Sequence, residues 1–285
     1  MTSLLSVNKW IGVAYEQFTG QSIETFRFIP GTTTLSTFKQ SVGFCAAYVC
    51  VIFSIKYIMR ERKPIESKFL FRIHNLFLSV LSLTLLLGFL EEMIPAWFNN
   101  GFFYAVCSQK ALTPQVELLL YINYLTKYYE LIDTLFLVFG KKDLKFLHWY
   151  HHAMTAILCQ VQLESETITS WTVVSLNLFV HVVMYYYYFL TTLNIRVWWK
   201  KYITVIQIIQ FVLDITIISL VSYTYIAYNY HPTWINWGNC HGNLWAASFG
   251  AGLLASYLLL FIKFFITTYN KPKVAKKTVE PKKEQ

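Results

Sequence analysis

Residues 146–163 read FLHWYHHAMTAILCQVQL, an apolar stretch long enough for a membrane helix that begins with three closely spaced histidines. His148, His151 and His152 follow the spacing i, i+3 and i+4, which places them on one face of a helix. A row of imidazoles facing the interior of a helix bundle is costly in a bilayer unless a polar function uses it. The stretch therefore predicts a transmembrane helix that carries part of an enzyme's reaction centre.

Six further stretches have the length and apolarity of a membrane span. The chain has 285 residues, of which 55% are hydrophobic and 18% aromatic, and this composition is too apolar for an ordinary soluble domain. We therefore expect an all-α membrane protein with seven transmembrane helices, at residues 41–59, 69–90, 115–139, 146–163, 168–191, 202–228 and 244–268.

The charges of the connecting loops alternate along the chain. Lys and Arg follow the first, third, fifth and seventh stretches, whereas the other loops carry Glu or neither Lys nor Arg. Because basic loops remain on the cytosolic side of a membrane, we expect a lumenal N-terminus and a cytosolic C-terminus. The basic segments contain Arg60, Arg62, Lys63 and Lys68, then Lys141, Lys142 and Lys145, then Arg196, Lys200 and Lys201, and finally the tail from Lys271.

This topology divides the chain into three parts. Residues 1–40 are expected to form a lumenal N-terminal segment, residues 41–268 the seven-helix domain, and residues 269–285 a cytosolic lysine-rich tail. The tail ends in Lys282-Lys283-Glu284-Gln285, which is similar to the dilysine retrieval signal of endoplasmic reticulum membrane proteins. The formal net charge of +9 lies in loop and tail clusters, a placement that indicates membrane topology and not nucleic-acid binding. We expect a multi-pass protein of the endoplasmic reticulum membrane that contacts membrane lipids and no nucleic acid.

Residues 115–139 contain ionisable side chains where a membrane span is usually apolar. Lys127, Glu130 and Thr134 share one helical face, and Asp133 lies beside them. Lys127 and Glu130 can neutralise each other as a structural ion pair, so this pair alone does not establish a functional cavity.

Two other predicted helices carry polar stripes. The stripe on residues 168–191 consists of Asn177, His181, Met184, Tyr185 and Tyr188. A single histidine there is more often a hydrogen-bonded core residue, and the tyrosines also fit an aromatic belt. The stripe on residues 202–228 consists of Gln207, Gln210 and Asp214, which can serve as hydrogen-bonding contacts between helices. At about 1.5 Å per residue, however, these stripes and the histidine row reach overlapping depths in the cytosolic half. The overlap predicts a chamber that opens to the cytosol.

Clustered histidines serve metal ligation, general acid–base catalysis or nucleophilic acyl transfer. Membrane di-iron desaturases and hydroxylases need several histidine boxes. This chain has seven histidines, of which His231 and His241 fall in lumenal loops and His74 is isolated on the second stretch. The di-iron alternative is therefore short of ligands, and we expect no bound metal. A seven-span receptor shares the topology but does not explain the histidine row.

Together these motifs resemble the fatty acid elongases, the ELO family of membrane 3-ketoacyl-CoA synthases, over nearly the whole chain. The family motif Lys-x-x-Glu-x-x-Asp-Thr is matched by Lys127, Glu130, Asp133 and Thr134, and the histidine box by His148, His151 and His152. The motif His-x-x-Met-Tyr-x-Tyr-Tyr is matched by His181, Met184, Tyr185, Tyr187 and Tyr188. In the motif Thr-Gln-x-x-Gln, Gln207 and Gln210 match, but Ile206 replaces the threonine. Residues 195–200 and 207–214 look most like the fungal and protist long-chain or very-long-chain branch.

The resemblance implies an acyltransferase of the very-long-chain 3-oxoacyl-CoA synthase type. Such an enzyme condenses a long-chain acyl-CoA with malonyl-CoA to give 3-ketoacyl-CoA, CO2 and CoA, with no bound cofactor. Its partners would be the ketoacyl-CoA reductase, hydroxyacyl-CoA dehydratase and enoyl-CoA reductase of the elongation cycle, and self-association into a homo-oligomer stays open. We expect His151 to act as nucleophile, flanked by His148 and His152, with His181 orienting substrate or stabilising an enolate. Direct condensation in a ternary complex is the alternative.

The expected substrate-binding residues divide by chemistry. CoA is polyanionic and should dock at basic residues near the cytosol, namely Lys141, Lys145, Arg196 and Lys200. The chamber itself should be lined by Lys127, Glu130, Asp133, Asn177, Tyr185, Tyr188, Gln207 and Gln210. The acyl tail should extend into the apolar lumenal half, past Ile217, Leu220 and Val221.

Two cysteines, Cys107 and Cys240, fall in different lumenal loops. Because the lumen is oxidising, we expect these two residues to form a disulfide.

Overall fold

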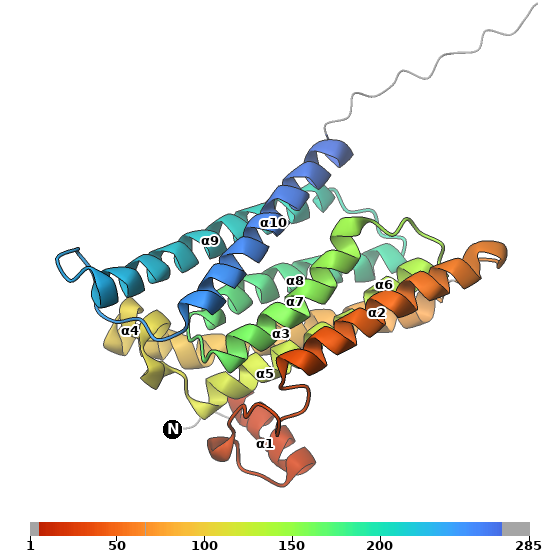
Figure 1. Ribbon diagram of the computed structural model, residues 1–285. Coiled ribbons are helices and arrows are strands. Elements are labelled where there is room, and N and C mark those ends of the chain that lie inside the picture. The colour runs from red at the N-terminus through yellow and green to blue at the C-terminus, as the bar shows by residue number, and fades with distance from the viewer. Residues whose placement is uncertain (1–5, 66, 270–285) are drawn as a thin grey trace, which may run out of the picture.

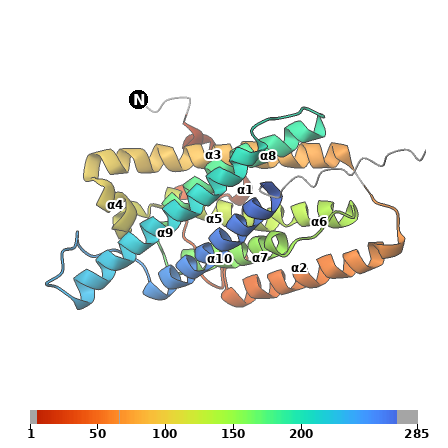
Figure 2. The same cartoon turned by 90° about the horizontal axis from the view of Figure 1, so that it is seen from above.

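The structure is a computed structural model that describes residues 6–65 and 67–269, and within these ranges all regular structure is helical. The long helices lie side by side in one bundle (Figures 1 and 2). Within the bundle, α3 packs along α8, α9 along α10, and α7 against both α2 and α5. In chain order the helices are α1 (Val7–Thr19), α2 (Phe38–Ile58), α3 (Lys68–Asn100), α4 (Phe102–Cys107), α5 (Pro114–Glu130), α6 (Ile132–Phe139), α7 (Phe146–Glu164), α8 (Ser170–Thr192), α9 (Lys200–Tyr230) and α10 (Leu244–Tyr269).

The predicted all-helical fold is confirmed. Of the seven predicted spans, five correspond to described helices that qualify by length and apolarity, and one predicted helix is divided inside the bundle. Residues 115–139 were expected to form one helix, but they form α5 and α6, which are separated at Leu131. There the Leu131 amide donates to Tyr128 O at 3.2 Å, a tighter turn than that of an α-helix. The expectation was wrong because this segment contains no Pro or Gly to signal the break.

Five of the described helices are long and apolar enough to cross a membrane. They are α2 with its extension to Glu61, α3, α8, α9 and α10. The chain is therefore a multi-pass membrane protein. The two remaining long segments, α5–α6 and α7, carry the ionisable cluster and the histidine row. The lysine-rich tail from Lys271 and its Lys282-Lys283 ending lie outside the described residues.

The bundle has two chemically different ends. The α2–α3, α6–α7 and α8–α9 connections lie together at one end (Figure 1), which we call the basic end because these connections contain Arg60, Arg62, Lys141, Lys142 and Arg196. The opposite end holds α1, α4 and the α9–α10 connection, and we call it the disulfide end.

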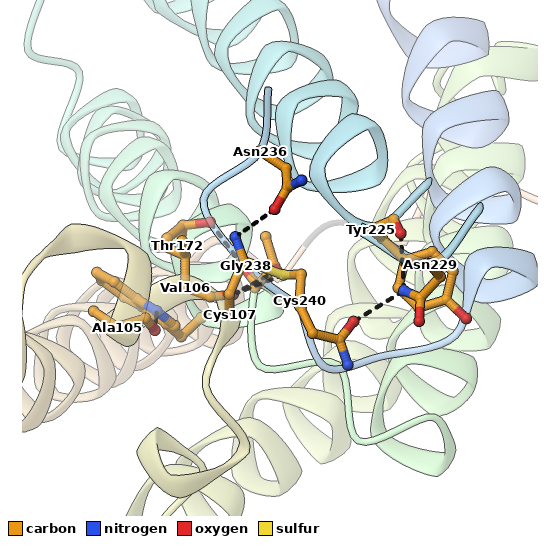
Figure 3. Close-up of a disulfide and its surroundings, with 12 residues drawn as sticks. Ala105, Val106, Cys107, Thr172, Tyr225, Asn229, Asn236, Gly238 and Cys240 are labelled. Atoms are coloured by element: carbon orange, nitrogen blue, oxygen red, sulfur yellow. Dashed lines mark hydrogen bonds between the residues drawn. A yellow bond between two sulfur atoms is a disulfide. The ribbon is translucent and has the colours of Figure 1, made fainter. Parts of the chain in front are cut away.

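The disulfide end is tied by a covalent bond and by hydrogen bonds. Cys107, the last residue of α4, forms a disulfide with Cys240 of the α9–α10 connection (Figure 3). Beside this bond, the His241 amide donates to Cys107 O at 2.8 Å, and Thr169 Oγ1 donates to Val106 O at 2.8 Å. Three connections that are distant in sequence are thus held together around one bond.

The N-terminal segment contains a helix that the sequence did not predict. The Glu91 carboxylate of α3 accepts hydrogen bonds from the amides of Val7 and Asn8, at 2.8 and 2.9 Å, at the start of α1. A carboxylate at a helix N-terminus satisfies free amides and complements the helix dipole. Glu91 therefore fixes α1 against the bundle.

Candidate active site

An ion-paired cluster connects α5 to α8 in the interior of the bundle. Lys127 Nζ donates to Glu130 Oε1 at 3.1 Å and to Asn177 Oδ1 at 2.9 Å. The same Glu130 oxygen lies 3.2 Å from His181 Nδ1. Lys127 and Glu130 are 2% and 3% exposed, so each depends on these partners for its polar contacts. The pair is therefore structural, and it also contacts two side chains of α8, of which Asn177 is hydrogen-bonded.

A second carboxylate, Asp133, connects α6 to α8 and α3. Tyr185 OH donates to Asp133 Oδ2 at 2.7 Å, and His74 Nε2 lies 2.7 Å from Asp133 Oδ1. The His74 ring packs between Tyr129 and Phe136, with ring centroids 5.1 and 5.2 Å away. The expectation that His74 is isolated was therefore wrong. A histidine in an otherwise apolar stretch indicates that it has a polar partner on another helix, because a polar ring without a partner is costly in a membrane.

The histidine row of α7 faces the interior of the bundle. The rings of His148 and His152 lie 4.6 Å apart between centroids, and the His151 ring lies 4.7 Å from that of Tyr257 on α10. His151 Nδ1 and His148 Nε2 are buried without a hydrogen-bond partner in the described structure. Across residues 6–65 and 67–269, no three His, Cys, Asp or Glu side chains are grouped as ligands for a metal ion.

A polar cavity of about 360 Å³ brings together residues of α6, α7, α8 and α9. All four histidines expected in the reaction centre line this cavity. The other expected site residues on its wall are Asp133, Lys145, Asn177, Tyr185, Tyr188, Lys200, Gln207 and Gln210. The sequence stripes therefore meet around one space, as the overlap in depth predicted.

The two amides of α9 each have one partner in the protein. Gln210 Nε2 donates to the buried Asp214 Oδ2 at 3.0 Å, and Gln207 Nε2 lies 3.6 Å from Met184 Sδ. These contacts leave the carbonyl oxygens of both amides available to the cavity.

A second cavity of about 100 Å³ extends from the reaction centre towards the disulfide end. Its wall is mostly apolar and includes Leu120, Leu158, Val174, Ile218, Val221 and Leu254. Lys127 reaches this wall but not that of the polar cavity, and Glu130 lines neither cavity. The expectation that both line the chamber was therefore wrong, because the two side chains are buried against each other. The two cavities share four lining residues: His151, Asn177, Gln210 and Phe211.

The positions expected along an acyl tail are not all on this wall. Val221 lines the apolar cavity, but Leu220 is 42% exposed and lines neither cavity. Ile217 is also absent from both walls, and its neighbour Ile218 takes that place. The expectation for Leu220 was wrong because a helix turns about 100° per residue, so adjacent residues face different sides.

The expected basic residues likewise do not all line a cavity. Lys145 and Lys200 line the polar cavity. Lys141 does not, because its Nζ donates to the backbone oxygens of Arg60 and Arg62 at 2.9 and 3.1 Å. Arg196 is exposed and lines neither cavity. Of the four expected basic residues, two therefore lie at the cavity and two lie outside it.

Comparison with known proteins agrees with the sequence motifs. The model of the ELO (GNS1/SUR4) family matches residues 33–277. Putative fatty acid elongase 1 of Schizosaccharomyces pombe is 46% identical over 252 residues, which cover 88% of this chain and 75% of the relative. Fatty acid elongase A of Dictyostelium discoideum is 35% identical over 258 residues, which cover 90% of this chain and 92% of the relative. The resemblance is thereby confirmed, and this chain belongs to the ELO family, whose members include proteins named fatty acid elongases.

Proposed function

We propose that this chain is the condensing enzyme of fatty acid elongation, which joins a long-chain acyl-CoA to malonyl-CoA. One observation carries the proposal: His151 lies on the wall shared by the polar cavity and the apolar cavity. A thioester joins a polar CoA to a hydrocarbon chain, so a reaction centre for thioesters needs both environments beside one nucleophile. The family relatives, which are named fatty acid elongases, support the same reaction class.

In the first step, an imidazole nitrogen of His151 attacks the acyl thioester carbonyl. Because Nδ1 is buried, Nε2 is the nitrogen available to a ligand in the cavities. The C–N bond forms, the C–S bond breaks, and CoA leaves as a thiolate that takes a proton from water. The acyl-imidazolium keeps its Nδ1 proton, which makes the acyl carbon a good electrophile.

In the second step, malonyl-CoA loses CO2, and the electron pair of the broken C–C bond forms an enolate. The enolate carbon attacks the acyl carbon, the C–N bond breaks, and His151 recovers its electron pair while 3-ketoacyl-CoA forms. Asn177 can stabilise the oxyanion, because its Oδ1 accepts from Lys127 and its Nδ2 is left as a donor. His181 lies on the wall of the polar cavity with its Nδ1 3.2 Å from Glu130 Oε1, and it orients malonyl-CoA.

The two cavities separate the parts of the substrate by polarity. Lys145 and Lys200 attract the phosphates of CoA to the basic end. The acyl chain occupies the apolar cavity among Leu158, Val221 and Leu254. The second candidate mechanism is direct condensation in a ternary complex, in which His151 acts as base.

The membrane placement belongs to the same proposal. The long segments α2, α3, α5–α6, α7, α8, α9 and α10 would make seven passes, with the basic end in the cytosol and the disulfide end in the lumen of the endoplasmic reticulum. A cytosolic basic end would receive both CoA substrates from water. It would also release 3-ketoacyl-CoA where the reductases and the dehydratase of the cycle can take it.

The test is incorporation of radiolabelled malonyl-CoA by protein purified in detergent, supplied with saturated acyl-CoAs of several lengths. We expect labelled 3-ketoacyl-CoA two carbons longer than the substrate from the wild type. His151→Ala should abolish it, and His231→Ala should retain it because His231 is exposed and lines neither cavity. An inactive wild type in this assay, or an active His151→Ala, would refute the proposal.

A further inference from the structure

A hydrogen-bonded chain of three side chains leads from α3 into the polar cavity. It runs from His74 to Asp133 and from Asp133 to Tyr185, with both contacts at 2.7 Å. His74 is 4% exposed and lines neither cavity, whereas Asp133 and Tyr185 line the polar cavity. The mechanism above gives no role to His74.

The last side chain of this hydrogen-bonded chain, Tyr185, packs against His181, which the proposed reaction uses. The Tyr185 ring meets the His181 ring edge-on, with centroids 5.3 Å apart and an interplanar angle of 88°. The Glu130 carboxylate lies 3.2 Å from His181 Nδ1, without the geometry of a hydrogen bond. The His181 ring is therefore in contact with both the Glu130 carboxylate and the Tyr185 ring, and of these two side chains Tyr185 is the one tied to Asp133 by a hydrogen bond.

Asp133 keeps its position only while both of its oxygens have partners in the protein. Oδ1 contacts His74 and Oδ2 accepts from Tyr185. Without His74, Oδ1 would be left without this partner beside a polar cavity, and the carboxylate would gain from turning towards water there. That rotation would draw the Tyr185 hydroxyl with it and free the His181 ring.

We propose that His74 is a positioning residue of the reaction centre, which fixes Tyr185 and His181 through Asp133 for the attack by the enolate. The inference rests on the proposed function, because it assigns His74 to the malonyl-CoA step of that reaction. His74 itself touches no substrate.

The packing of α3 on α8 does not depend on His74 alone. On one side of it, Arg72 Nη2 donates to Thr192 O at 3.3 Å, and on the other, Ser79 Oγ donates to Val182 O at 3.1 Å. Ser79→Ala therefore provides a matched control, since it removes a bond between the same two helices without touching Asp133.

The decisive comparison is between His74→Leu and His74→Gln. Leu fills the space without a donor, whereas the Gln amide nitrogen can take the place of Nε2 and donate to Asp133. We expect kcat of condensation to fall about 100-fold in His74→Leu, the scale of a misplaced reacting group, with KM for both substrates unchanged. His74→Gln should recover most of the turnover, and Ser79→Ala should match the wild type.

A half-reaction assay separates this role from a general loss of fold. His74→Leu should still release CoA from acyl-CoA alone at the wild-type rate, because His151 is not in the chain. Tyr185→Phe, which removes the other hydrogen bond of Asp133, should show the same selective loss. Wild-type turnover in Tyr185→Phe or in folded His74→Leu would overturn the inference, as would an equal loss in Ser79→Ala. An inactive wild type would instead refute the proposed function.

Discussion

His181 Nδ1 lies 3.2 Å from Glu130 Oε1, and this contact is the middle one of three between α5–α6 and α8. Lys127 contacts Asn177 on one side of it, and Asp133 contacts Tyr185 on the other. Steps of three residues on α5–α6 thus match steps of four residues on α8. Side chains from two helices are thereby fixed along one wall of the polar cavity.

The buried pair of Lys127 and Glu130 leads to a stability prediction. Lys127→Met removes the cation and leaves the Glu130 carboxylate in the interior, which should destabilise the fold by about 3 to 5 kcal/mol. The double variant Lys127→Met with Glu130→Gln should recover part of this loss, because no unpaired charge remains. Thermal unfolding in detergent measures both effects, and a single variant as stable as the wild type would contradict the structural role of the pair.

The disulfide should contribute to stability and not to turnover. Cys107 and Cys240 are 133 residues apart in sequence, and closing a loop of this size restricts the unfolded chain by about 5 kcal/mol in the loop-entropy model. Neither cysteine lines the polar cavity or the apolar cavity. Cys240→Ser should lower the unfolding temperature with little change in kcat of the folded protein, while Cys50→Ser, an exposed free cysteine, serves as control. A large loss of kcat in folded Cys240→Ser would argue against this separation.

The apolar cavity should limit product length. Val221→Trp and Ile218→Trp would fill part of this cavity. The surrounding interior is close-packed and cannot yield, so the acyl chain would meet an obstruction before reaching its usual depth. We expect shorter products from both variants, with condensation of short substrates retained. Leu220→Trp should leave product length unchanged because Leu220 faces away from the cavity. Gas chromatography of the products measures the difference, and equal effects at all three positions would place the acyl chain elsewhere.

The basic end should bind CoA through two of its lysines. Lys145→Gln and Lys200→Gln should raise KM for both acyl-CoA and malonyl-CoA. Added salt should raise the same two KM values of the wild type, because it screens the attraction between lysine and phosphate. Lys141→Gln is the matched control, because its ammonium is used by backbone oxygens outside the cavity. Steady-state kinetics at two salt concentrations test this division, which fails if Lys141→Gln has the larger effect.

The sequence predicted the polar residues of the site because helical periodicity fixes which side chains share a face. His151, His181 and Gln210 come from three helices, and their similar depths were enough to predict a common chamber. Periodicity does not say which helix packs beside which. The contact between His74 and Asp133 depends on α3 packing along α8, where its side chains reach α6, so it was missed.

Two further differences have local causes. The break at Leu131 follows from tight backbone turns on both sides of it, in which the Leu131 amide donates to Tyr128 O and the Thr134 amide donates to Leu131 O. The sequence has no Pro or Gly there to indicate the break. Lys141 was grouped with Lys145 by charge and proximity, but Lys141 has a positive φ of 52° and its side chain is held by backbone oxygens of another connection. Composition gives the charge of a loop, whereas its backbone path decides where each charge points.

The central claim is that His151 carries the acyl group between two half-reactions, and incubation with acyl-CoA alone tests it most directly. Purified protein is mixed with acyl-CoA without malonyl-CoA, free CoA is measured against enzyme, and the peptide containing His151 is examined by mass spectrometry. We expect one CoA per enzyme and the mass of the acyl group on that peptide in the wild type, with neither in His151→Ala. Condensation by the wild type without any such release of CoA would contradict the account and favour the ternary complex.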